Sequence, residues 1–257
     1  MCGIFGIGFL SKCKNYEFIE TLTKELFKIV EKRGTDASGI TFVSKKKIHV
    51  IKEGIAGSRL IDTDKFKIAC NTMINDELLQ IIGHCRLQTK GSYLQNVNNH
   101  PIISNSVIGV HNGFVSNDDK LFKHYKSITE LTRAGEVDTE IIFRLIDYHA
   151  KKNNMDLIKA TVETTKELDG DFACAFTHSQ KPYILGLFKK FNPTVIRHYI
   201  KDNVIIYCSN DSYINIALKQ TDNNLLGNYD DIKYKNKSGM FINLLNNKYQ
   251  TVNNLFT

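Results

Sequence analysis

Eight short runs of β-branched and aromatic residues constrain the fold of this chain more than any other feature of its sequence. Turns rich in Gly, Asn, Asp or Lys separate the runs, which cover residues 37–43, 47–54, 81–87, 106–113, 171–178, 182–188, 194–200 and 203–210. Runs of this kind are typical of β-strands. Many strands with few helices between them indicate antiparallel sheets.

Helical spacing of apolar residues marks three further segments. One covers 16–32 and has Gly34 as a stop, a second begins at an Asp138 cap and continues to residue 152, and a third covers 155–168. The chain has three prolines and shows no linker, repeat or low-complexity tract. We therefore expect one α+β domain over residues 1–257, with sheet packed against sheet and helices outside.

The composition excludes several classes of protein. No stretch approaches the roughly 18 consecutive apolar residues of a membrane helix, and no basic leader precedes the apolar start, so we expect a cytoplasmic protein without a membrane partner. The six cysteines form no CxxC pair, and the spacing of His84, Cys85, His100 and His111 matches no common zinc pattern, so we expect no metal. The net charge of +7 comes mostly from scattered lysines, and we expect no nucleic-acid partner.

The N-terminal sequence MCGIFGIGFL places a cysteine directly after the methionine. Removal of Met1 would leave Cys2 with both a thiol and a free α-amine, whose reference pKa is about 7.7 to 8.0. An amine of that pKa can exchange a proton with the adjacent thiol near neutral pH. The alternative is a cysteine that packs as a small apolar residue at the start of a strand.

Four other segments combine glycine with polar side chains where a core strand would have neither. They are RGTDASG at 33–39, GHCRLQTKG at 83–91, NNHPI at 98–102 together with VHNGFVSN at 110–117, and EVDTE at 136–140. Each alone has a structural explanation, since Asn followed by Gly is a common turn and Asp138 is a good helix cap. Their order along the chain is more informative than any one of them.

In that order, the motifs MCGIFG, RGxDxSG, GHxRxxTxG, NHP, HNGxxxN and DTE resemble those of the class II glutamine amidotransferases, which are N-terminal nucleophile hydrolases. The resemblance is greatest to the glutaminase domain of glucosamine-6-phosphate synthases, and LDGDFACAF and CSND extend it over essentially the whole chain. It implies a four-layer αββα sandwich of two antiparallel sheets flanked by helices. It also implies hydrolysis of L-glutamine to L-glutamate and ammonia without a cofactor.

The resemblance assigns a chemical role to five residues. Cys2 would attack the side-chain amide and form a γ-glutamyl thioester, while its α-amine moves the proton. The side-chain amide of Asn112 and the backbone N–H of Gly113 would form the oxyanion hole. Arg86 would bind the α-carboxylate of glutamine, and Asp138, together with the Gly113 carbonyl, would bind its α-ammonium.

Five further residues would assist. Thr89 and Lys90 would add contacts to the carboxylate, chiefly through backbone or hydroxyl groups. His100 would line the site or order the turn that follows it. Arg33 and Asp36 would support the loop around the nucleophile and not touch the substrate.

Two features depart from the family pattern. Leu87 follows the motif arginine, where glucosamine-6-phosphate synthases have a tryptophan that helps to gate the ammonia path. The chain ends at Thr257 without acceptor chemistry, so we expect a separate synthase or isomerase subunit to receive the ammonia. Two alternatives stay open: a hydrolase of larger γ-glutamyl compounds, and a non-catalytic glutamine-binding regulatory module that keeps Met1.

Overall fold

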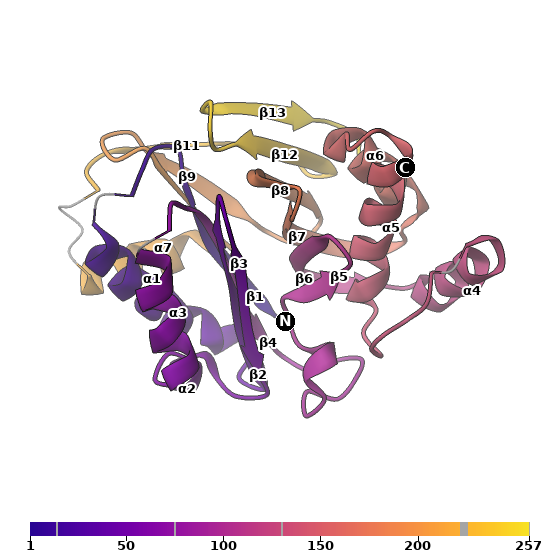
Figure 1. Cartoon of the computed structure of the whole chain (residues 1–257), viewed down its shortest axis with the longest axis horizontal. Helices are drawn as coiled ribbons and strands as arrows, with labels where there is room; N and C mark the ends of the chain where they lie inside the picture. Colours follow the sequence, from indigo (N-terminus) through magenta and orange to yellow (C-terminus); the bar gives the residue numbers. More distant parts are fainter. Residues whose placement is uncertain (14, 75, 130, 222–225, 257) are drawn as a thin grey trace.

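Two antiparallel sheets form the centre of the computed structural model, which describes residues 1–13, 15–74, 76–129, 131–221 and 226–256 (Figure 1). The first sheet has the strand order β11-β9-β10-β1-β4-β2-β3, and the second has the order β13-β12-β8-β7-β6-β5. The strands of the first sheet are β1 (Gly3–Phe9), β2 (Ala37–Ser44), β3 (Ile48–Glu53), β4 (Leu78–Arg86), β9 (Val195–Tyr199), β10 (Val204–Cys208) and β11 (Tyr229–Asp231). Those of the second are β5 (Ile102–Ser104), β6 (Val107–Val115), β7 (Gly170–His178), β8 (Lys181–Lys190), β12 (Ser238–Asn243) and β13 (Lys248–Val252).

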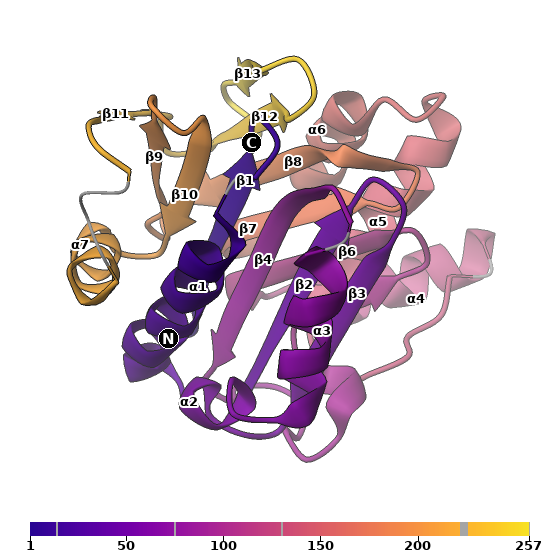
Figure 2. The ribbon, with the colours of Figure 1, turned by 60° about the vertical axis from the view of Figure 1, so that its left-hand side comes forward.

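Helices cover the outer face of each sheet, so the molecule has four layers (Figures 1 and 2). The helices on the first sheet are α1 (Tyr16–Val30), α2 (Gly57–Leu60), α3 (Asp64–Ile74) and α7 (Asp211–Gln220). Those on the side of the second sheet are α4 (Asp118–Ile128), α5 (Thr139–Lys152) and α6 (Leu157–Glu167). The predicted αββα sandwich is confirmed. Among the described residues, no helix combines the length and the apolarity needed to cross a bilayer.

Three apolar cores fill the spaces between these layers. Phe5, Leu26 and Phe66 belong to the core between the first sheet and its helices. Phe143 and Phe176 belong to the core between the second sheet and α5. A third core lies between the two sheets and includes Ile4, Val110 and Leu187. Burying a side chain of this size stabilises a fold by roughly 1.5 to 3 kcal/mol, so the facing layers are held firmly together.

Strand alternation decides which side chains of β1 meet the second sheet. Ile4 belongs to the core between the sheets, whereas Phe5 belongs to the core under α1. Successive side chains of a strand point to opposite faces, so the even-numbered positions of β1 face inward. Continued back by one step of two residues, the same pattern places Cys2 on the inner face.

The same rule applies to β4 and β6. Ile82 and Val110 belong to the core between the sheets. Counting on in steps of two therefore places His84 and Arg86 of β4, and Asn112 of β6, on the inner faces. The periodicity of three separate strands thus gathers polar side chains at one end of the space between the sheets.

The first helix ends earlier than its apolar spacing predicted. It begins after Asn15, whose side chain accepts a hydrogen bond from the backbone N–H of Phe18 at 3.0 Å. It ends at Val30, and the 3₁₀ turn Glu31–Arg33 follows. This turn changes the chain direction and brings Arg33 back to β1.

The predicted strands did not include β1, β5, β11, β12 or β13, and the predicted helices did not include α2, α3, α4 or α7. Every residue of β11 is exposed, and so are four of the five residues of β13. Both are edge strands, where burial imposes no alternation on the sequence. β5 is only three residues long, too short to show a period. The connection between helices α5 and α6, by contrast, lies where the sequence placed it.

Candidate active site

Cys2 precedes the first residue of β1 and is partly buried. Its neighbour Gly3 pairs with Cys85 of β4, and the Sγ of Cys2 donates a hydrogen bond to the backbone carbonyl of Leu87 at 3.4 Å. Burial raises the pKa of the Cys2 thiol above its usual value, and the nearby Arg86 guanidinium offsets part of that rise. The thiol is therefore protonated at neutral pH and needs a base before it can act as a nucleophile.

Arg33 and Asp36 hold the backbone around Cys2. The Nε of Arg33 donates to the Cys2 carbonyl at 2.8 Å. The Oδ2 of Asp36 accepts from the backbone N–H of Gln88 at 2.7 Å, and the Asp36 N–H donates to the Arg86 carbonyl at 3.1 Å. These bonds tie the turn after α1 both to the start of β1 and to the segment that leaves β4.

Arg86 is 3% exposed and is enclosed by the loop that follows it. Its Nη1 donates to the Oδ1 of Asn99 at 2.8 Å, and its Nη2 donates to the carbonyls of Lys90 at 2.8 Å and Gly91 at 2.6 Å. A guanidinium has five N–H donors, so these three bonds leave two donors. Asn99 fixes the direction of the guanidinium, and the sequence analysis missed it although it lies inside the NNHPI segment.

Lys52 supports the same asparagine from β3. Its Nζ donates to the Asn99 carbonyl at 2.7 Å. Burial lowers the pKa of Lys52 to about 8, although the Glu140 carboxylate opposes that change. No motif contains Lys52, and only the pairing of β3 with β2 brings it to this loop.

Thr89 and Lys90 lie at the rim of the site. Thr89 is exposed. The Nζ of Lys90 forms ion pairs with Asp118 at 2.6 Å and Asp119 at 3.2 Å at the start of α4, and Arg133 binds the same Asp118 at 2.6 Å. The ammonium of Lys90 is thus directed to α4, while its backbone carbonyl holds Arg86. A contact of either residue with a substrate carboxylate stays a prediction.

Asn112 and Gly113 lie near the end of β6, opposite Ala173 and Phe172 of β7. The Nδ2 of Asn112 is buried and has no hydrogen-bond partner among the residues that the structure describes. Gly113 has a φ of 149°, and a Cβ there would lie 1.9 Å from the Asp171 carbonyl oxygen, so only glycine fits. A buried amide without a partner is unfavourable by about 1 to 3 kcal/mol, and it is available to a ligand oxygen.

Asp138 caps α5 and joins it to the end of β6. Its Oδ1 accepts from the Thr139 N–H at 2.9 Å, and its Oδ2 accepts from the Val115 N–H at 2.7 Å. The carboxylate is 8% exposed. It acts to raise the pKa of both the Cys2 thiol and the Arg86 guanidinium, which places it within electrostatic reach of both groups.

Three buried histidines form the wall behind these groups. The rings of His84 and His100 stack with centroids 4.1 Å apart. The Nε2 of His84 lies 3.1 Å from the His111 carbonyl, which can only accept, so this nitrogen carries the proton. The Thr139 hydroxyl lies 2.9 Å from the Nδ1 of His111 and 3.2 Å from the Nε2 of His100. Burial lowers the pKa of all three, that of His84 to about 3, so they are neutral at pH 7.

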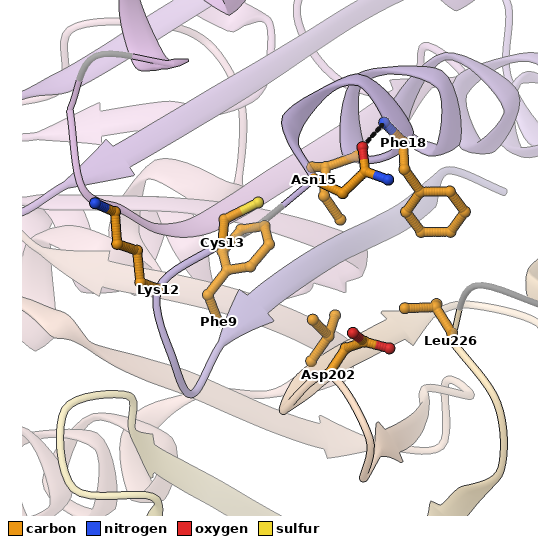
Figure 3. Close-up of a pocket in the computed structure, with 9 residues that line it drawn as sticks. Phe9, Lys12, Cys13, Asn15, Phe18, Asp202 and Leu226 are labelled. Atoms are coloured by element: carbon orange, nitrogen blue, oxygen red, sulfur yellow. Dashed lines mark hydrogen bonds between the residues drawn. The ribbon is translucent and has the colours of Figure 1, made fainter.

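Hollows lie near both ends of β1. An open one of about 520 Å³ lies near the N-terminus and is lined by Met1, Glu31, Lys32, Arg33, Gly34, Thr35, Leu87 and Tyr213. A smaller one of about 90 Å³ is lined by Phe9, Lys12, Cys13, Asn15, Phe18, Ile19, Asp202, Val204 and Leu226 (Figure 3). Gly3 and Phe9 stand six residues apart in a strand, which is about 20 Å, so the smaller hollow is separate from the candidate site. Within the described part of the chain, no group of three or more His, Cys, Asp or Glu side chains is placed to hold a metal ion.

The fold and these residues agree with the family that the motifs indicated. Residues 84–194 match the family model described as a glutamine amidotransferase domain. The chain is 32% identical over 216 residues to the glutamine–fructose-6-phosphate aminotransferase (isomerizing) of Buchnera aphidicola subsp. Baizongia pistaciae, a match that covers 80% of this chain and 32% of that protein. It is 25% identical over 216 residues to the 7-cyano-7-deazaguanine synthase of Saccharolobus solfataricus, covering 83% of this chain and 44% of that protein.

A solved structure has the same fold. Glutamine phosphoribosylpyrophosphate amidotransferase from B. subtilis, complexed with ADP and GMP, superposes with a TM-score of 0.73 at 15% identity, covering 98% of this chain and 49% of that one. The matched residues and the sequence relatives identify a class II glutamine amidotransferase domain in this chain. It spans about a third of the length of the first of these relatives and less than half of the others.

Proposed function

We propose that this chain hydrolyses the side-chain amide of L-glutamine to L-glutamate and ammonia. The observation that carries the proposal is the buried Nδ2 of Asn112, which has no partner among the described residues and lies on the inner face of the second sheet, opposite the inner face of the first sheet that carries Cys2 and Arg86. A folded protein gains nothing from an amide that donates to no acceptor. An oxyanion that forms during attack by Cys2 would supply the acceptor.

Removal of Met1 completes the catalytic residue. Met1 is 70% exposed, so its removal disturbs no core packing. The freed α-amine of Cys2 takes the thiol proton as Sγ forms a bond to the amide carbon of glutamine. The C–N bond then breaks, and the proton passes to the departing nitrogen, which leaves as ammonia. Water hydrolyses the thioester, releases glutamate and returns the proton to the thiol.

Arg86 and Asp138 would hold the amino-acid end of the substrate. Its three bonds to the described residues leave Arg86 one N–H donor on Nε and one on Nη1, and a charge-assisted bond from either would hold an oxygen of the α-carboxylate. Among the described residues, backbone N–H groups and not cations bind the two oxygens of Asp138. An α-ammonium is therefore the cation that this carboxylate lacks. Thr89, Lys90 and His100 would complete the surroundings of the carboxylate.

We infer that residues 1–257 form one glutaminase domain whose ammonia is used by an acceptor domain. Ammonia released into neutral water is mostly protonated and is then not a nucleophile. The names of the two sequence relatives concern different compounds, since one names fructose 6-phosphate and the other names 7-cyano-7-deazaguanine as the compound synthesised. The acceptor class therefore stays open. A separate synthase or isomerase subunit is the acceptor that we propose.

One observation favours a second candidate, the hydrolysis of larger γ-glutamyl compounds. The open hollow of about 520 Å³ is lined in part by Leu87, whose carbonyl accepts a hydrogen bond from the Cys2 thiol, so a leaving group larger than ammonia would find room near the nucleophile. The turnover of γ-glutamyl dipeptides, measured beside that of glutamine, tests this candidate. A higher kcat/KM for the dipeptides would support it.

The central test uses the full chain with Met1 removal checked by intact mass. Glutamate release from glutamine should fall by about 10⁴-fold or more in Cys2→Ala. The substitution removes the nucleophile and leaves the α-amine with no thiol proton to accept. Cys13→Ala is the matched control, since Cys13 is a free, buried cysteine beyond the other end of β1. Unchanged activity in Cys2→Ala, or a wild-type chain that keeps Met1 and releases no glutamate, would contradict the proposal.

A further inference from the structure

The turn that follows β8 reaches across to the candidate oxyanion hole. The Nδ2 of Asn192 donates a hydrogen bond to the backbone carbonyl of Asn112 at 3.1 Å. The two residues are 80 positions apart in the sequence, and no motif contains Asn192. Asn192 is only partly buried, so burial alone does not explain the placement of its amide.

The carbonyl that Asn192 binds belongs to the peptide group that joins Asn112 to Gly113. A trans peptide is planar, with its C=O and N–H pointing in opposite directions. A bond that fixes the Asn112 carbonyl therefore also fixes the direction of the Gly113 N–H, the second donor of the proposed hole. Donation into a peptide carbonyl also polarises the group and strengthens its N–H as a donor.

Gly113 needs such a constraint more than an ordinary strand residue does. Its φ of 149° lies in a region that glycine alone enters readily. Glycine also has more backbone freedom to lose than any other residue. Pairing with β7 holds one edge of this part of β6, whereas the Nδ2 of Asn112, which precedes Gly113, has no partner among the described residues.

The turn itself is held in an unfavourable conformation. Phe191 has a φ of 68° and is 61% exposed, although a left-handed backbone is costly for an aromatic residue. The Oδ1 of Asn236 accepts from the Phe191 N–H at 2.7 Å, and the Asn192 N–H donates to the Lys190 carbonyl at 2.9 Å. These two bonds keep the side chain of Asn192 directed at β6.

We propose that Asn192 is a positioning residue of the oxyanion hole. Its side-chain amide holds the Asn112–Gly113 peptide so that the Gly113 N–H faces the reacting carbonyl oxygen. The inference rests on the proposed glutamine hydrolysis and adds to that site a residue from the turn that follows β8. It predicts that loss of the Asn192 amide weakens transition-state binding more than substrate binding.

The peptide can be observed directly by NMR. Asn112–Gly113 is the only Asn-Gly pair in the sequence, so a chain labelled with ¹³C′-asparagine and ¹⁵N-glycine gives one carbonyl-to-amide cross peak. We expect this peak to shift or broaden in Asn192→Leu and in the isosteric Asn192→Asp. The matched control is Asn153→Leu, which removes another amide-to-carbonyl bond, from Asn153 to His149 at 2.8 Å, and should leave the peak unmoved.

Kinetics supply the second readout. In Asn192→Leu the kcat for glutamine should fall about 10-fold with KM almost unchanged, a smaller loss than the 10²- to 10³-fold that follows removal of a donor. A peak that stays in place together with a kcat within about twofold of Asn153→Leu would overturn the role of Asn192 alone. A wild-type chain without glutaminase activity would overturn the proposed function on which this inference rests.

Discussion

The two ends of β1 lie beside different kinds of buried side chain, although side chains alternate between the two faces of the strand in the same way along its whole length. At the Gly3 end, the facing inner faces of the two sheets carry Arg86 and Asn112 near Cys2, and the buried amide of Asn112 has no partner among the described residues. At the Phe9 end, mostly apolar side chains, together with Lys12, Asn15 and Asp202, line a hollow of about 90 Å³. Both ends belong to one rigid strand in the middle of the first sheet.

The contrast separates the end of β1 that stabilises the fold from the end that carries the candidate reacting groups. Apolar burial at the Phe9 end lowers the free energy of the folded state. Polar burial at the Gly3 end raises it unless a ligand completes the missing bonds. Substitutions at the two ends should therefore separate stability from catalysis, and three predictions test that separation.

The largest effect on stability should come from Phe9, which is 2% exposed. Phe9→Ala should lower the free energy of unfolding by about 3 to 5 kcal/mol, because the substitution removes apolar contacts and enlarges an existing hollow. The kcat for glutamine should stay within about twofold of wild type at a temperature where the variant is folded, since the reacting groups lie about 20 Å away. Urea unfolding and initial rates measure the two quantities. A fall in kcat without unfolding would show that β1 couples its ends.

Asn112→Ala should give the opposite result. The kcat should fall by about 10²- to 10³-fold, which corresponds to about 2.7 to 4 kcal/mol, because one oxyanion donor is lost. The free energy of unfolding should change much less than in Phe9→Ala, because removal of an unpaired buried amide offsets the small cavity that is left. Steady-state kinetics and urea unfolding on the same sample check both parts. A stability loss equal to that of Phe9→Ala would make Asn112 a packing residue.

The smallest effect should appear as acid sensitivity of the polar end. The pKa of His84 falls from an ordinary value of 6.5 to about 3 on folding, so the unfolded chain binds the proton more tightly. Its contribution to stability is complete above pH 6.5 and is lost as the pH falls toward 3. Each pH unit in that range is worth about 1.4 kcal/mol, so His84 accounts for about 2 kcal/mol between pH 6.5 and pH 5.

His84→Gln provides the comparison for that prediction. Glutamine carries no titrating group, and its amide can still donate to the His111 carbonyl that His84 binds at 3.1 Å. The difference in unfolding free energy between pH 7 and pH 5 should be about 2 kcal/mol smaller in the variant. The same pH dependence in both proteins would mean that His84 is not the group that takes up the proton.

Local sequence patterns predicted a large part of this structure. The eight β-branched runs all lie in strands, and Asp138 caps the helix that it was expected to start. These features depend on neighbours within a few positions, through side-chain period and backbone hydrogen bonding. The ordered motifs also indicated the family. The exposed edge strands could not be predicted, because no core faces them.

The partners of the site residues could not be read from the chain. Lys90 was expected to contact the substrate carboxylate chiefly through its backbone, and no pattern predicted that its ammonium binds two aspartates of α4. Asn99 fixes Arg86, and Asn192 fixes the Asn112 carbonyl. Each of these contacts depends on the conformations of the loops between strands. No local periodicity or motif spacing in the sequence predicts those conformations.

The sequence by itself determined which side chains of a strand share its inner face, because side chains alternate between the two faces of a strand. It also determined which residue types are available for chemistry. Only the tertiary structure decided which of those groups meet. Antiparallel pairing brings β1 beside β4, and the packing of one sheet on the other brings β6 opposite them. Such contacts join positions far apart in the chain, so they depend on the free energy of packing the entire domain and not on the local sequence.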